Sequence, residues 1–388
     1  MVKVTGVKTV VVDAGLRNWV FVKVTTDVPG LVGWGEATLE WKTRAVVGAV
    51  QDLEALVAGA DALRTEHLWQ LLRRGHFFRG GAVGMSAVSG IDQALWEIKA
   101  KHLGVPCWQL FGGMVRHSVR MYDHLGGGDA AITYGPATAE RFAEAARQSV
   151  ADGFTALKIL AVPMGGPMPG GPQIREAAAL LRAVRETVGD DVDIMVDLHG
   201  RTNAAAAIQY GQALAEFRPW FFEEPCQPGN IAEMAEVAAR LPIPVATGER
   251  LIDVQEFRDH LAAGACAVLQ PDVCHVGGPS ALRRIAAIAE SHQVPLAPHN
   301  PLGPVSTAVN QHVGFATSNF LIQEVMRGDV PWRDEVCPGS LPIVDGHVMI
   351  PETPGWGVKV DEVAARRYPY RPEPPLDLVQ PDGSVADW

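Results

Sequence analysis

From about residue 118 to residue 325, the sequence repeats one pattern, in which a short, almost continuously apolar run precedes an alanine-rich amphipathic stretch. Apolar runs of this kind are typical of parallel strands that helices cover on both faces. We expect eight strands, at 118–124, 155–160, 192–198, 219–224, 243–249, 266–272, 294–299 and 319–324. We expect helices near 137–152, 173–188, 203–216, 230–240, 253–262 and 278–292. Eight such units favour a closed (β/α)-type barrel over an open sheet.

The first 117 residues show a different pattern of apolar residues. Runs of β-forming residues at 4–12, 19–26 and 30–37 are followed by helical periodicity at 42–59, 66–74 and 84–103. We therefore predict an α+β domain at 1–117 and a barrel domain at 118–325. The tail at 326–388 is rich in proline and glycine, and we expect it to pack back on the N-terminal domain.

Composition limits the classes of partner. The 388-residue chain has a formal net charge of −11 and no tract rich in lysine and arginine, which argues against nucleic acids and anionic membranes. No apolar run approaches the ~20 residues that span a bilayer, and the N-terminus lacks the pattern of a signal peptide. The five cysteines are scattered without a C-x-x-C pair, as expected for reduced thiols in the cytoplasm.

Nearly all of the expected barrel strands end in a polar or ionisable residue, and chemistry in such barrels takes place at these ends. Asp197, Glu223 and Glu249 end three consecutive strands at equal intervals of 26 residues. Carboxylates crowded together repel one another unless a cation neutralises them, and oxygen ligands favour Mg²⁺ over Zn²⁺. The alternative is that each carboxylate pairs with a basic neighbour, for example Glu249 with Arg250. The equal spacing favours a Mg²⁺ site.

Two histidines flank these carboxylates. His199 follows Asp197 by two residues, and strand side chains two apart share a face. His299 ends a later strand, one strand after Asp272, and a carboxylate beside an imidazole fixes its tautomer and raises its basicity. The alternative is a buried histidine satisfied by hydrogen bonds. With the carboxylates nearby, both histidines are candidates for proton transfer.

Recognisable motifs are spread over nearly the whole chain: FFRGG (77–81), MSAVSGIDQALWEIK (85–99), WQLFGG (108–113), DLHGR (197–201), FEEP (222–225), GER (248–250), LQPD (269–272), APHNPLGP (297–304), QE (323–324) and SVADW (384–388). As a set they resemble the enolase superfamily in its mandelate racemase subgroup. The resemblance implies a fold of class α/β, in which a modified (β/α)8 barrel of the TIM type carries an α+β capping domain. It also implies that Asp197, Glu223 and Glu249 bind Mg²⁺.

The resemblance further implies roles in proton transfer. In similar dehydratases, the histidine at the position of His199 is the acid that expels a hydroxyl. The histidine paired with aspartate, here His299 with Asp272, removes the proton next to the carboxylate, and Glu324 matches the position that hydrogen-bonds the developing enediolate. The implied reaction removes water from an aldonic acid, with D-galactonate the first candidate, to give a 2-keto-3-deoxy acid.

One position departs from the pattern. Racemases and some lactonising relatives carry Lys-x-Lys at the end of the second barrel strand, whereas this chain keeps Lys158 and has Leu160 at the second position. Leucine cannot remove a proton, which argues against racemisation by a Lys/His pair. Four alternatives remain open: dehydration of another acid sugar such as D-gluconate, an epimerase or cycloisomerase reaction, an inactive binding relative, and a metal-dependent barrel hydrolase. The hydrolase would need several histidine ligands at its metal.

Substrate choice is expected to depend on polar and aromatic loops of the N-terminal domain at 13–19, 38–44 and 76–81, although ordinary solvent loops are the alternative. The glycine- and proline-rich stretch 161–173 is expected to border the site. We expect the protein to be a cytoplasmic homo-oligomer whose partner is a small acid sugar, with no nucleic acid and no membrane. The candidate substrate-binding residues are Asn18, Trp41, Arg79, His124, Lys158, Arg201 and Asn300.

Overall fold

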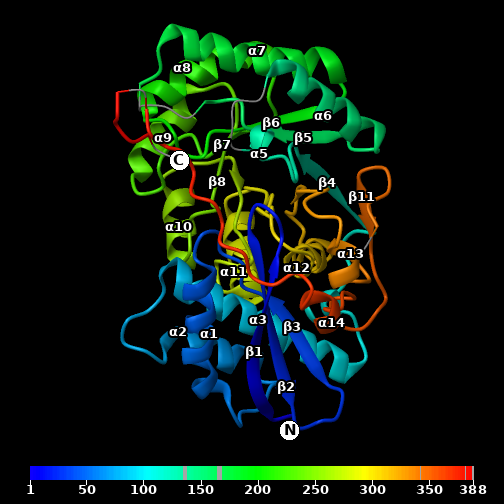
Figure 1. The fold of residues 1–388 in the computed structure, drawn as a ribbon. Coiled ribbons are helices and arrows are strands. Elements are labelled where there is room, and N and C mark those ends of the chain that lie inside the picture. Colours follow the sequence, from blue (N-terminus) through cyan, green and yellow to red (C-terminus); the bar gives the residue numbers. More distant parts are fainter. Residues whose placement is uncertain (134–137, 164–167, 341, 381, 387–388) are drawn as a thin grey trace.

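The computed structural model describes residues 1–133, 138–163, 168–340, 342–380 and 382–386. An antiparallel three-stranded sheet and a larger parallel sheet organise these residues, and the blue sheet lies below the green and yellow barrel in Figure 1. Three predicted features fall partly outside the described residues: the start of the helix at 137, part of the stretch 161–173 and the end of the SVADW motif.

The parallel strands close into the predicted barrel. The strands are β4 (Ser118–His124), β5 (Ala156–Ile159), β6 (Asp193–Asp197), β7 (Phe222–Glu223), β8 (Val245–Thr247), β9 (Val268–Leu269) and β10 (Gln323–Val325). The six strands β4 to β9 pair side by side in chain order, and a further strand, β10, pairs with β4. The seventh position is reduced to a bridge at Leu296, which pairs in parallel with Leu269 and with Phe320.

Amphipathic helices cover the outside of the barrel. Helix α10, for example, buries Phe257 and Leu261, which lie four residues apart on one face. The helices are α6 (Ala139–Ala151), α7 (Gly171–Val188), α8 (Ala204–Leu214), α9 (Ile231–Arg240), α10 (Val254–Ala262), α11 (Gly278–Ser291) and α12 (Pro304–Phe315). Helix α12 was not predicted, because all of its residues except Thr307 are buried and it has no polar stripe to reveal the helical period.

The N-terminal residues form a separate α+β layer against the barrel (Figure 1). Its elements are β1 (Val4–Asp13), β2 (Asn18–Thr26), β3 (Val32–Glu36), α1 (Thr43–Val57), α2 (Thr65–Arg74) and α3 (Gly81–Leu103). Glycines on β3 let α3 approach closely: a Cβ on Gly33 would lie 2.0 Å from Ala94 O, and one on Gly35 would lie 2.0 Å from Gly90 O. The sequence prediction of a capping domain is confirmed in this arrangement.

The C-terminal segment returns to the cap, as the orange-to-red chain in Figure 1 shows. Asp13 donates its backbone N–H to Tyr368 O at 2.9 Å, and Asn18 Nδ2 donates to Arg371 O at 2.7 Å. The boundaries at residues 117 and 325 stay predictions. The remaining elements are α4 (Cys107–Leu110), α5 (Ala130–Thr133), η1 (Ala215–Phe217), α13 (Arg333–Val336), α14 (Glu362–Ala365) and β11 (His347–Met349), an unpredicted strand that pairs antiparallel with β4.

Candidate active site

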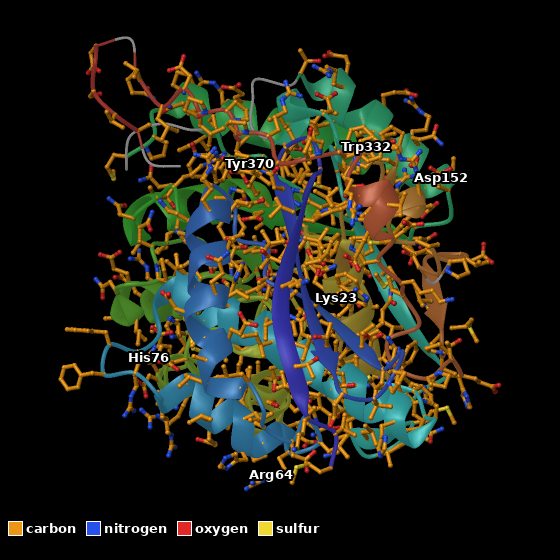
Figure 2. All side chains as sticks on the ribbon, turned by 60° about the horizontal axis from the view of Figure 1, so that its bottom comes forward. Lys23, Arg64, His76, Asp152, Trp332 and Tyr370 are labelled. Atoms are coloured by element: carbon orange, nitrogen blue, oxygen red, sulfur yellow. The ribbon has the colours of Figure 1, made fainter. Side chains whose placement is uncertain are left out.

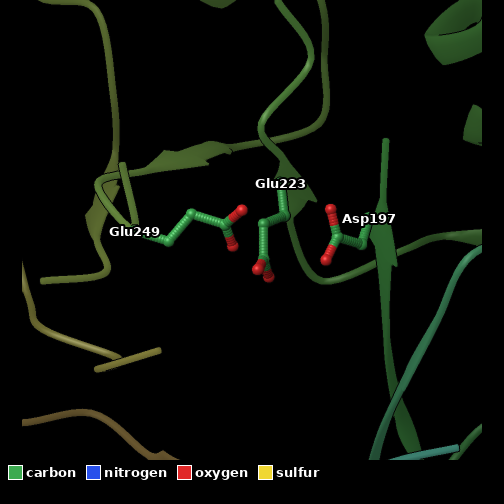
Figure 3. Close-up of side chains that lie close together, drawn as sticks. All are labelled: Asp197, Glu223 and Glu249. Atoms are coloured by element: carbon green, nitrogen blue, oxygen red, sulfur yellow. The ribbon is translucent and has the colours of Figure 1, made fainter. Parts of the chain in front are cut away.

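Three carboxylates meet at the carboxyl ends of neighbouring strands. Asp197 ends β6 and pairs in register with Glu223, which ends β7, and Glu249 follows β8. One carboxylate oxygen from each residue lies within 4.8 Å of the other two, and Figure 3 shows the groups facing one another. Asp197 and Glu223 are buried, and the side chain of Glu249 is 11% exposed. The residues predicted from their spacing are therefore close enough to share one cation.

The alternative of pairing with basic neighbours fails for Glu249, because Arg250 pairs with Glu224, but it holds in part for Asp197 and Glu223, which both contact Lys158. The Arg250 guanidinium donates to Oε2 of Glu224 at 2.9 and 2.6 Å. The cation among the three carboxylates is Lys158, whose Nζ lies 2.5 Å from Glu223 Oε1 and 3.3 Å from Asp197 Oδ2. Lys158 Nζ also lies 2.8 Å from Glu324 Oε1, so its single positive charge does not by itself balance the three carboxylates.

The electrostatics of the cluster fit a divalent cation. Burial and the charge of Asp197 raise the pKa of Glu223 well above its usual range, and burial also raises that of Glu249. Burial would raise the pKa of Asp197 too, but the nearby His199 and Lys158 hold it well below its usual range. Asp197 Oδ2 and Glu249 Oε2 are buried and have only long ion-pair contacts, at 3.3 Å to Lys158 Nζ and His199 Nε2 and at 3.5 Å to His299 Nε2. An all-oxygen donor set with unused lone pairs suits Mg²⁺.

His299 forms a dyad with Asp272. Its Nδ1 lies 2.7 Å from Asp272 Oδ2, and its Nε2 lies 3.5 Å from Glu249 Oε2. Burial alone would lower the pKa of His299, but the charge of Glu249 and the hydrogen bond to Asp272 raise it to about 10. A cation on Glu249 would offset that charge and favour the neutral imidazole, the form that accepts a proton at Nε2.

His199 lies on the other side of Asp197, in a left-handed backbone conformation with φ 52°. Its N–H donates to Asp197 Oδ1 at 2.9 Å, and its Nε2 lies 3.3 Å from Asp197 Oδ2. Strand β6 ends at Asp197, so the alternation of strand side chains is not what orients His199. A tight turn beyond the strand directs its imidazole to the same carboxylate.

Glu324 on β10 lies within the same charge network. Its Oε1 is 2.8 Å from Lys158 Nζ and 3.1 Å from His124 Nδ1, and its Oε2 accepts the N–H of Asn300 at 2.7 Å. Burial would raise the pKa of Glu324, but the charge of Lys158 lowers it far below its usual range. Glu324 is therefore ionised here and accepts hydrogen bonds, and Lys158 is the stronger donor for a developing negative charge.

A cavity of about 250 Å³ lies over these groups, between residues of the barrel and of the cap. The barrel contributes both candidate proton-transfer histidines, Glu249 and Lys158, and the cap contributes residues from the loops after β1 and β3. Among the described residues, its lining is Arg17, Leu39, Glu40, Trp41, Ala82, His124, Thr133, Lys158, His199, Glu249, Arg250, Ile252, His275, His299, Pro301, Leu302 and Met326. A site that joins proton donors and acceptors to a carboxylate cluster is suited to chemistry at a carbon acid.

Two sequence families match the two parts of the chain. Residues 2–112 match the family described as mandelate racemase / muconate lactonizing enzyme, N-terminal domain, and residues 141–364 match the family described as enolase C-terminal domain-like. The chain belongs to the mandelate racemase / muconate lactonizing enzyme family. This confirms the resemblance to the enolase superfamily inferred from the motifs.

Individual members of the family are similar over nearly their whole length. The chain is 38% identical to a D-galactonate dehydratase of Verminephrobacter eiseniae and 37% identical to one of Ralstonia nicotianae, over 96% of this chain and 97% of each relative. Among solved structures, a member of the enolase superfamily from Salmonella Typhimurium has a TM-score of 0.89 at 32% identity, over 95% of this chain and 99% of that one. A mandelate racemase/muconate lactonizing enzyme from Sulfitobacter sp. has a TM-score of 0.88 at 35% identity, over 96% of each chain.

Three of the seven candidate substrate-binding residues of this family member line the cavity: Trp41, His124 and Lys158. Arg79 does not, because it lies in the exposed loop between α2 and α3. Figure 2 marks this loop by His76, at the outer edge of the cap. The neighbouring Phe77 and Phe78 are 92% and 91% exposed.

The other three candidates are buried but do not line the cavity. Asn18 Nδ2 bonds the C-terminal segment at Arg371 O, and Arg201 Nη1 donates to Val162 O at 2.6 Å. Asn300 donates its N–H to Glu324, directly behind the cavity wall. Their polar groups form hydrogen bonds with neighbouring segments. A polar residue in a loop can serve this purpose or bind substrate, and the sequence alone does not tell the two apart.

Arg17 and His275 are two of the polar cavity residues that the sequence did not identify as candidates. Arg17 lies beside the predicted Asn18 in the loop 13–19, and only the tertiary fold shows that Arg17 faces the cavity whereas Asn18 does not. His275 follows Asp272 by three residues and lies 3.6 Å from Asp272 Oδ2 through its Nε2. That spacing in PDVCH was a usable signal, because a residue in the turn after a strand end often returns to its carboxylate.

Proposed function

We propose that this chain is a Mg²⁺-dependent hydro-lyase that removes water from an aldonic acid, with D-galactonate as the first candidate substrate. The observation that carries the proposal is that His199 and His299, the latter bonded to Asp272, line one cavity beside the three-carboxylate cluster. The names of the relatives that are 37–38% identical support the choice of D-galactonate.

Asp197, Glu223 and Glu249 would hold Mg²⁺, which when bound supplies stabilisation for negative charge on the substrate carboxylate. Lys158, buried and cationic, donates hydrogen bonds to the same carboxylate as that charge develops. Deprotonation next to a carboxylate is otherwise very unfavourable, because it creates a second negative charge. Lys158 and the metal site would thus stabilise the negative charge that makes deprotonation unfavourable.

The two histidines divide the proton transfers. His299, oriented by Asp272, takes the C2 proton at Nε2, and the electron pair left at C2 is delocalised into the carboxylate. His199 then gives a proton to the 3-hydroxyl as the C3–O bond breaks, so that water leaves and an enol remains. The enol tautomerises to the 2-keto-3-deoxy acid. General acid and general base catalysis each contribute about 10²–10⁴-fold in enzymes.

Leu160 supports elimination over racemisation. It is a buried hydrocarbon side chain, 8% exposed, at the position where racemases carry a second basic residue. A carbanion formed by His299 therefore lacks a lysine acid on that side, whereas His199 lies ready to assist departure of a hydroxyl. Dehydration of a different acid sugar would use the same groups.

The test is a screen of aldonic acids with Mg²⁺, following 2-keto acid formation by semicarbazide absorbance. D-Galactonate is expected to give the product, with D-gluconate and the other aldonates run beside it. Signal with another aldonate alone would move the substrate and keep the reaction, and an epimerised acid without keto product would overturn the reaction. A cytoplasmic location and a homo-oligomeric state also remain proposals, and light scattering of the purified protein would measure the second.

A further inference from the structure

The loop that joins His299 to α12 is fastened at four consecutive residues by charged side chains. Glu324 accepts the N–H of residue 300, Arg17 Nη1 donates to the carbonyl of residue 301 at 2.7 Å, and Arg333 Nη2 donates to the carbonyl of residue 302 at 3.1 Å. Glu36 accepts the N–H of residue 303 at 2.8 Å. Arg17 and Glu36 belong to the cap, so the cap forms hydrogen bonds with the segment that follows the candidate base His299.

Glu36 makes the most specific of these contacts. It ends β3, is fully buried, and accepts a second backbone N–H, that of Ser306, through Oε2 at 2.9 Å. The N–H groups of Gly303 and Ser306 belong to the N-cap and N3 positions of α12, the two donors that a capping box satisfies with two side chains. Here one carboxylate, 267 residues earlier in the chain, accepts from both.

Glu36 itself is fixed on the cap side. Thr38 Oγ1 donates to Glu36 Oε1 at 2.7 Å, and Gln93 of α3 exchanges hydrogen bonds with the Glu36 backbone at 2.9 Å in both directions. The fit leaves no room for a side chain at Gly303, since a Cβ there would lie 2.5 Å from Glu36 Oε1. The contact is therefore rigid on both sides of the interface.

We propose that Glu36 is a positioning residue that sets the place of the general base His299 by capping α12 across the interface between cap and barrel. The inference rests on the proposed role of His299. Only three residues, 300–302, separate His299 from the capped residue Gly303. A shift of the helix start is therefore transmitted along a short, fully bonded loop to the imidazole, and a misplacement of about 1 Å can cost ~10²-fold in rate.

The test compares Glu36→Gln with Glu97→Gln. Glutamine is close in size to glutamate, but its amide N–H₂ replaces one acceptor and opposes a backbone donor. In Glu36→Gln we expect exchange of the substrate C2 proton in D₂O and dehydration to fall together by about 10- to 100-fold in kcat, with KM and Mg²⁺ affinity within about threefold. Amide hydrogen exchange of a peptide spanning 299–307 should speed up by at least ~10-fold, whereas the peptide spanning β6 stays unchanged.

Glu97 is the matched control. It is a fully buried cap carboxylate that accepts the N–H of Trp34 at 2.6 Å and pairs with Lys101, away from the loop. Glu97→Gln should lower thermal stability but leave kcat and the 299–307 peptide unchanged. The proposal is overturned if folded Glu36→Gln keeps parental kcat and protection of 299–307. If Glu36→Gln does not fold, the same two measurements on Glu36→Asp decide. Because amide exchange needs no substrate, failure of the proposed reaction would be seen separately.

Discussion

Asp197 connects the metal site to the candidate acid, because it belongs to the carboxylate cluster and also accepts the N–H of His199. Replacing it by asparagine removes one negative charge and keeps the shape. We expect Asp197→Asn to lose Mg²⁺ affinity by at least ~100-fold in calorimetric titration, together with activity. Asp193→Asn, at the start of the same strand and paired with Arg120, is the control and should bind Mg²⁺ normally. Full activity of the parent protein in excess chelator would contradict the metal assignment.

The two histidines should separate in isotope exchange. His299→Asn removes the base, so neither wash-in of deuterium at C2 nor dehydration is expected, and both should fall by about 10²–10⁴-fold. His199→Asn removes only the acid, so exchange at C2 should continue in D₂O while water is not eliminated. The exposed His67 supplies the control, since His67→Asn should match the parent in both assays. Deuterium appearing at C2 with His299→Asn would show that another group is the base.

At the scale of elements, the barrel strands were predictable because each is a short apolar run, and nearly all of these runs have a polar residue at or just beyond their end. That same rule brought Asp197, Glu223 and Glu249 together from spacing alone. Helix α12 was missed because burial on all sides removes its polar face. The substrate-facing residues were harder, because Arg17 and Asn18 are adjacent in sequence and point into different surroundings. Local patterns determine where an element runs, whereas contacts between distant segments determine which loop residue faces the cavity.

Helix α11 depends on a cap from another element, as α12 does. Its N-cap is Gly277, and buried Asp92 of α3 accepts the N–H of Ser280 at 3.0 Å and its hydroxyl at 2.8 Å. Asp92→Ala should lower the free energy of unfolding by about 1–3 kcal/mol, because it leaves a buried N–H unpaired. Urea unfolding would measure this. Asp361→Ala, which uncaps the short helix α14 at an exposed position, should cost less, and an equal loss in both variants would contradict the interface role of Asp92.

On the scale of the whole molecule, the cap, barrel and C-terminal segment are joined by buried polar groups in addition to apolar packing. His312 of α12 accepts the N–H of Trp108 at Nδ1, and its Nε2 lies 3.2 Å from Trp356 O, so it bonds to two other segments in its neutral form. Contacts between segments that are distant in sequence therefore contribute to the stability of the fold. None of the described helices is long and apolar enough to span a membrane.

Protonation of His312 should lower the free energy of unfolding, because this residue joins three segments. Burial lowers its pKa from 6.5 to about 3, so the unfolded chain binds a proton at a higher pH than the folded protein does. Stability from this residue is complete above pH 6.5 and is lost as the pH falls toward 3. Between pH 6.5 and 5 the loss is about 2 kcal/mol. In His312→Gln, whose amide keeps one donor and one acceptor, the difference in unfolding free energy between pH 7 and pH 5 should shrink by that amount. His67→Gln, at an exposed site, should keep the parental difference, and an unchanged pH dependence in His312→Gln would show that this histidine does not couple the fold to pH.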